Sequence, residues 1–122
     1  MTTQQTITLP ELAHGEIYAG LILNEDGTPS HHLILLAGDE TTTFDNAPAV
    51  AAVMGGELPT RREQSLLFAN CKQHFNRDWY WSSEAYESDS GYAWYQGFSS
   101  GYQFLHHKTS ELRARAVRRL PI

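Results

Sequence analysis

The chain has 122 residues and a formal net charge of −5, with 41% hydrophobic and 19% charged residues. This composition excludes a disordered polyampholyte and a fibrous repeat, and the length suits a single domain, residues 1–122, with a core of its own. The chain contains no stretch of about 20 apolar residues and no cationic, apolar leader at its start, so we expect a soluble cytoplasmic protein without a membrane anchor.

The single cysteine and the distribution of charge argue against a disulfide-dependent fold and against binding to nucleic acid. Cys71 has no second cysteine with which to form an internal disulfide, so the fold does not depend on an oxidising compartment. Basic residues gather in 108–122, whereas 1–107 is strongly acidic. An acidic body repels a polyanion, which disfavours nucleic acid as a partner.

The first third of the chain predicts a β-hairpin. A short β-prone run at 7–9 stops at Pro10, and apolar strands follow at 16–23 and 32–36. The turn-rich segment 24–29 separates these two strands. Because their apolar runs barely alternate with polar residues, we expect strands that are covered on both faces or partly covered by helices.

Two helices are predicted in the middle of the chain. Asp45 or Asn46 is positioned to cap a short helix that runs through Met54, with Pro48 in its first turn. Thr60 and Glu63 have the spacing of a capping box, which predicts a second helix from about 61 to about 74. Its apolar stripe contains Leu67, Cys71 and Phe75.

The second half of the chain predicts a β-meander. Segments 79–83, 91–98, 102–108 and 112–120 have β composition and are separated by turn-rich stretches. In 91–98, alternation places Trp94 and Phe98 on one face and Tyr95 on the other. We expect the face with Trp94 and Phe98 to form core and Tyr95 to point outward.

Four short motifs occur in a recognisable order. They are Gly56-Glu57-Leu58-Pro59-Thr60 before a helix, Tyr80-Trp81-Ser82-Ser83, Ala93-Trp94 with Phe98 and Gly101, and Arg115-Ala116-Val117-Arg118. Residues 55–119 thereby resemble the Lcl C-terminal domain family, which is common in bacteria and phages. The resemblance implies an α+β, C-type-lectin-like fold with two helices packed on a twisted antiparallel β-sheet with long loops. The family usually has Trp-Arg before Leu-Pro-Thr, where this chain has Gly56-Glu57.

Eleven of the fourteen aromatic residues lie between Phe75 and Phe104. Trp residues are usually highly buried, so we assign the three tryptophans to the core, and we interpret the outward tyrosines as candidates for stacking on a ligand. The ligand candidates are Tyr86, Tyr95 and Tyr102. The expected core residues are Leu58, Leu67, Cys71, Phe75, Trp81, Trp94 and Phe98.

Histidine pairs provide an alternative, a metal site. His31-His32 and His106-His107, with His14 and His74, supply imidazoles that zinc, copper or iron could bind. Adjacent residues on a strand point to opposite faces, however, and no His-x-His, Glu-x-x-His or paired-cysteine motif is present. We therefore expect surface histidines, a buried unreactive thiol at Cys71, and no metal or other cofactor.

Alternation along 112–120 gives the arginines two orientations, with Arg113, Arg115 and Arg119 facing outward. Alternation places Arg118 on the inner face of its strand, where a guanidinium needs a carboxylate or carbonyl partner. We therefore expect Arg118 or Arg115 to form a structural salt bridge, and the alternative is a solvated basic strand.

Together these features favour a non-enzymatic binding or accessory protein of phage or prophage type, located in the cytoplasm or in a phage particle. Its partner would be a glycan, a protein surface or a second copy, and exposed aromatic residues beside an open sheet edge are compatible with a homodimer. Two alternatives remain open. One is an enzyme whose metal is held by histidines from separate strands, and the other is a nucleic-acid-binding protein that uses the arginine strand.

Overall fold

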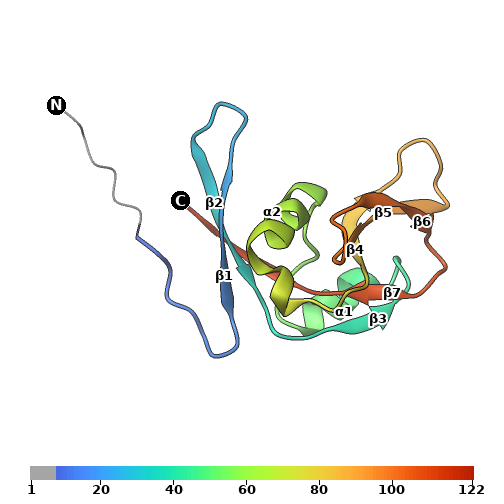
Figure 1. Ribbon diagram of the computed structural model, residues 1–122, viewed down its shortest axis with the longest axis horizontal. Coiled ribbons are helices and arrows are strands. Elements are labelled where there is room, and N and C mark those ends of the chain that lie inside the picture. Colours follow the sequence, from blue (N-terminus) through green and yellow to red (C-terminus); the bar gives the residue numbers. More distant parts are fainter. Residues whose placement is uncertain (1–7) are drawn as a thin grey trace.

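The computed structural model describes residues 8–122. It is an α+β fold (Figure 1). The elements follow in the order β1 (Ile17–Leu23), β2 (Pro29–Leu35), β3 (Glu40–Thr42), α1 (Ala47–Val53), α2 (Arg61–Cys71), a 3₁₀ turn (Lys72–His74), β4 (Trp79–Ala85), β5 (Tyr92–Gly97), β6 (Gln103–His107), β7 (Leu112–Ala114) and β8 (Val117–Pro121).

The strands form two sheets. One is antiparallel, in the order β1-β2-β8, and the other has the order β3-β7-β4-β5-β6, in which only β4 and β7 are parallel. Helix α2 lies between the sheets in Figure 1 and contacts β1 as well as β4 and β5. One helix therefore shields part of both sheets.

The predicted hairpin is confirmed as β1 and β2. Its turn closes through hydrogen bonds from Asn24 N to the Thr28 carbonyl (2.8 Å) and from Gly27 N to the Asn24 carbonyl (2.9 Å). Leu33, Ile34 and Leu35 are completely buried, so β2 is covered on both faces. Of the β-prone run at 7–9, Ile7 lies outside the described residues, while Thr8 and Leu9 belong to no strand.

Both predicted helices are present. The Thr60 hydroxyl accepts from Glu63 N (3.1 Å), and the Glu63 carboxylate accepts from Thr60 N (2.9 Å), which completes the capping box of α2. Helix α2 ends at Cys71 and tightens into the 3₁₀ turn, so the last predicted turn has a different geometry. Asn46 precedes α1, but its side chain makes no capping hydrogen bond.

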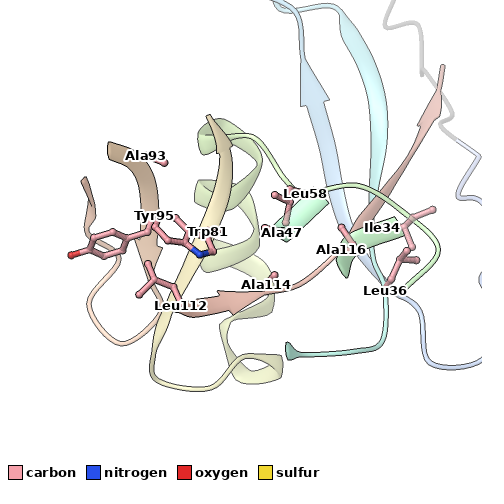
Figure 2. Packing of buried hydrophobic residues seen from close by; sticks show 11 residues of the cluster. Ile34, Leu36, Ala47, Leu58, Trp81, Ala93, Tyr95, Leu112, Ala114 and Ala116 are labelled. Atoms are coloured by element: carbon pink, nitrogen blue, oxygen red, sulfur yellow. The ribbon is translucent and has the colours of Figure 1, made fainter. Parts of the chain in front are cut away.

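Two hydrophobic clusters form the core. The first, shown in Figure 2, joins Trp81 and Tyr95 of the larger sheet to Ala47 of α1 and Ile34 of β2. The second joins Leu67 and Cys71 of α2 to β1, β2, Tyr80 and Phe98. Strand β2 contributes to both clusters, which explains why its side chains are buried on both faces.

The predicted meander is correct for β4, β5 and β6 and wrong for the segment 112–120. That segment splits at Arg115-Ala116 into β7, which pairs with β3 and β4, and β8, which joins the other sheet beside β2. The buried Arg115 side chain donates to the carbonyls of His74 and Leu36, and Leu36 N donates to the Ala116 carbonyl (3.0 Å). These bonds hold the chain between the sheets, where a continuous strand was expected.

Candidate functional site: an aromatic cleft

A cleft of about 490 Å³ lies on the larger sheet and is lined by Trp79, Tyr95, Ser100, Tyr102 and Phe104. We call it the aromatic cleft. Tyr95 pairs with Phe104 on β6 and with Trp81 on β4, and Trp79 lies two residues before Trp81. Residues that are paired or two apart share a face, so strand alternation alone gathers Trp79, Tyr95 and Phe104 on one side of the sheet.

The floor and the rim of the aromatic cleft differ in exposure. Tyr95 is 8% exposed and forms the floor, and the Trp79 ring stacks on it with centroids 4.8 Å apart and planes at 26°. Trp79 is 43%, Phe104 62% and Tyr102 71% exposed. The fixed floor thus supports rings that offer apolar surface to solvent.

A tight loop between β5 and β6 places Ser100 and Tyr102 at the rim. Gly97 N donates to the Tyr102 carbonyl (2.7 Å), and Gly101 N donates to the Gly97 carbonyl (2.9 Å). Gly101 has a φ of +85°, a backbone angle that residues other than glycine rarely adopt. A Cβ at Gly101 would also lie 2.9 Å from the Phe68 ring, so the loop needs glycine there for two reasons.

The chemistry of the aromatic cleft is neutral. Among residues 8–122, no carboxylate, amine, guanidinium or thiol lines it, and the His106 imidazole packs beside Trp79 and Tyr95 without belonging to the lining. The Trp79 indole N–H and the hydroxyls of Tyr95, Ser100 and Tyr102 have no hydrogen-bond partner within residues 8–122. Burial raises the pKa of Tyr95, so its phenol stays protonated and able to donate. Such a surface can stack on a flat apolar face and bind hydroxyl groups around it.

The sequence-predicted ligand tyrosines separate in the structure. Tyr102 belongs to the aromatic cleft, whereas Tyr86 packs edge-on against Trp94, 5.9 Å between centroids, outside it. The outward orientation expected for Tyr95 is wrong, because Tyr95 is in the core.

The core assignment of Trp94 is also wrong. Trp94 is half-buried, and the Arg61 guanidinium lies 3.5 Å above its ring. Alternation along β5 correctly separates the two faces, but the packing of Trp81 and Leu112 makes the Ala93 and Tyr95 face the more buried one.

The other expected core residues lie as follows. Leu58, Leu67, Cys71, Trp81 and Phe98 are buried, and Phe75 is half-buried and stacks on Phe98 with centroids 3.9 Å apart. Burial raises the pKa of the Cys71 thiol and outweighs the nearby charge of Arg115, which would lower it. The thiol therefore stays protonated.

Sequence reasoning missed Trp79 and Phe104 as site residues. Trp79 was assigned to the core because tryptophan usually is, yet it is partly exposed at the start of β4. A signal was present in the sequence, since the predicted strand 102–108 places Tyr102 and Phe104 two residues apart and hence on one face.

The arginines near the end of the chain are engaged by other groups of the protein. Arg118 forms two hydrogen bonds with the Glu16 carboxylate (2.8 and 2.9 Å), whereas Arg115, 9% exposed, has carbonyl partners instead of a carboxylate. The remaining ion pairs join Arg113 to Asp39 and Asp78, and Arg119 to Glu57 and Glu63.

The histidine pairs are dispersed. His31 Nε2 lies 2.8 Å from Glu63, and His32 Nδ1 lies 2.7 Å from the Tyr18 hydroxyl. His106 packs beside Trp79, and His107 beside Tyr92. Between residues 8 and 122 no three His, Cys, Asp or Glu side chains lie close enough together to hold a metal ion.

No protein-family model matches the chain, and no curated protein matches it significantly. Among the described residues, no helix is long and apolar enough to cross a membrane.

Proposed function

We propose that this protein is a non-catalytic binding module with a C-type-lectin-like fold, of phage or prophage type, whose aromatic cleft binds a neutral sugar ring of a glycan. The observation that carries the proposal is the exposed Trp79 ring, fixed on the buried Tyr95 and flanked by unpaired hydroxyl and indole donors.

A pyranose fits this chemistry on both of its surfaces. Its C–H face is apolar and flat enough to stack on Trp79 or Tyr102, and its equatorial hydroxyls can pair with Ser100 and the tyrosine hydroxyls. Rigid aromatic side chains lose little conformational entropy when they bind a ligand. The neutral lining gives no advantage to an anionic sugar or a phosphate.

The aromatic cleft also lacks the groups that catalysis requires. In the part of the chain that the structure describes, its lining contains no carboxylate, imidazole or thiol to act as a general base or nucleophile. The same lining favours binding without turnover.

The test is a glycan array that carries neutral and anionic oligosaccharides, followed by titration of the strongest hit. We expect binding to neutral glycans that weakens about tenfold or more in Trp79→Ala and Tyr102→Ala. Tyr86→Ala is the matched control, because it removes an aromatic ring outside the aromatic cleft and should leave the affinity unchanged. If no neutral glycan binds, or if Tyr86→Ala weakens binding as much as Trp79→Ala, the proposal is wrong. A protein array run in parallel would then show whether a protein surface is the ligand.

A further inference from the structure

Strand β6 is an outer strand whose free edge no other strand of residues 8–122 covers. It is the last strand of the larger sheet and pairs with β5 in an unbroken register from Tyr92↔His107 to Gln96↔Gln103. Within residues 8–122, the outer edge of β6 receives one hydrogen bond, from Ser110 N to the His107 carbonyl at the end of the strand. An open edge of this kind is a template for another strand.

The hydrogen-bond register shows which backbone groups are free. Gly97 N donates to the Tyr102 carbonyl, and Lys108 N donates to the Gly91 carbonyl. Hydrogen-bonded pairs alternate along an antiparallel ladder, so Phe104 and His106 exchange their bonds with β5. The amide groups of Gln103, Leu105 and His107 therefore point away from the sheet.

The other outer strands carry features that obstruct pairing. The register of β1 is interrupted twice, and Gly20 at one of the interruptions has a φ of +131°. Strand β3 has three residues, and β8 contains two arginines and Pro121. In contrast, β6 contains no Asp, Glu, Lys or Arg and no proline. Two copies of β6 can therefore approach each other without like-charge repulsion.

We infer that β6 pairs antiparallel with β6 of a second copy of this chain, with Leu105 opposite Leu105 across a twofold axis. In this register Leu105 N donates to the Leu105 carbonyl of the partner copy, and His107 N donates to the Gln103 carbonyl. The symmetry of the pair repeats each bond in the other direction. No other register of β6 against itself overlaps the full length of both strands.

Side chains support the same register. Phe104 of one copy stands opposite His106 of the other in a pair that does not exchange hydrogen bonds, where side chains approach most closely. Phe104 is 62% exposed, and its ring stacks on no other aromatic ring within residues 8–122, whereas His106 already packs on Trp79 and Tyr95. The pairing would thus cover the exposed Phe104 ring of one copy with His106 of the other copy, which is already held against Trp79 and Tyr95.

The twofold axis of such a pair is perpendicular to the sheet, so both aromatic clefts would face the same side. The inference itself rests on the edge of β6 and is independent of the ligand proposed above.

Sedimentation equilibrium of the full chain over a concentration series tests the inference. We expect a mass that approaches twice the 13.8 kDa of the chain. Leu105→Pro removes an outward N–H and leaves the bonds to β5 intact, so it should raise the dimer dissociation constant about 30-fold or more. Leu105→Ala, which retains the N–H, is the matched control and should still form the dimer. Circular dichroism checks that both variants are folded.

Cross-linking tests the register directly and does not depend on the proline variant. Opposed Cα atoms of a hydrogen-bonded pair lie about 5.5 Å apart, within the range that a disulfide spans. Mild oxidation of Leu105→Cys should give a covalent dimer, and Gln103→Cys should cross-link with His107→Cys but not with itself. A wild-type chain that stays monomeric, a Leu105→Pro dimer of unchanged affinity, or a different cross-linking pattern would each overturn the inference.

Discussion

Arg118 on β8 forms two hydrogen bonds with the carboxylate of Glu16, immediately before β1. Strands β1 and β8 are not neighbours, since β2 lies between them in the sheet. The ion pair therefore braces the sheet across its width, independently of the ladder hydrogen bonds.

This ion pair predicts a component of acid sensitivity. The hydrogen bond from Arg118, together with one from Ala13 N, lowers the pKa of Glu16 from 4.5 to about 2. The stabilisation is complete above pH 4.5 and is lost as the pH falls towards 2. In that range the Glu16 carboxyl takes up a proton in the unfolded state but remains ionised in the folded state, which favours unfolding. The free-energy gap between wild type and Glu16→Gln, from urea unfolding, should be constant near neutral pH and close between pH 4.5 and 2. Glu87→Gln, at an exposed position, should show no such gap.

The buried carboxylate of Glu63 should contribute far more to stability than its neighbour Glu57. Glu63 is 2% exposed in its side chain, and hydrogen bonds from Arg119, Thr60 N and His31 outweigh the effect of burial and lower its pKa. Glu63→Gln leaves the Arg119 guanidinium partly buried without its main partner and should cost about 3 kcal/mol. Glu57 is 74% exposed, and Glu57→Gln should cost less than about 1 kcal/mol. Equal costs in urea unfolding would contradict this assignment.

Two glycines allow strain and steric clash to be separated. Gly101 and Gly27 have nearly the same positive φ, +85° and +87°. A Cβ at Gly27 meets nothing within 4 Å, whereas one at Gly101 meets Phe68. Gly27→Ala should cost about 1 kcal/mol, and Gly101→Ala about 2–4 kcal/mol, because only the latter must displace a ring. Thermal unfolding of the two variants measures the difference, and similar melting temperatures would show that Phe68 moves freely.

The tryptophans of β4 should differ sharply although they are two residues apart. Trp81 is fully buried, packs on Phe44 at 5.3 Å and donates to the Thr42 carbonyl (2.9 Å). Trp81→Ala should cost about 3–5 kcal/mol or prevent folding, whereas Trp79→Ala should cost about 1 kcal/mol. Denaturant unfolding monitored by circular dichroism checks both. A large loss of stability in Trp79→Ala would place this residue in the core and weaken the case for the aromatic cleft.

Local chemistry determined the parts of the fold that could be predicted. The capping box at Thr60 and Glu63 and the turn before β2 depend on neighbouring residues, and the sequence displays them directly. The division of 112–120 into β7 and β8 depends on carbonyls of Leu36 and His74, which are distant in sequence from Arg115. No periodicity within the segment itself reveals those partners.

The candidate site was predictable to the same extent. Alternation identifies which residues of one strand share a face, and it correctly places Tyr95 on the face of β5 opposite to Trp94. It does not say which face the rest of the chain covers. Trp94 and Tyr95 are therefore exchanged between core and surface relative to the prediction, because the packing of Trp81 and Leu112 makes the Tyr95 face the more buried one.

The position of residues 112–121 in the topology bears on how the protein is made. Strand β7 lies between β3 and β4, and β8 completes the smaller sheet beside β2. Until the ribosome has released this segment, the larger sheet lacks an inner strand and the hairpin of β1 and β2 lacks its neighbour. Cooperative folding of both sheets must therefore follow the synthesis of residues 112–121, and a nascent chain stalled before residue 112 should be sensitive to protease.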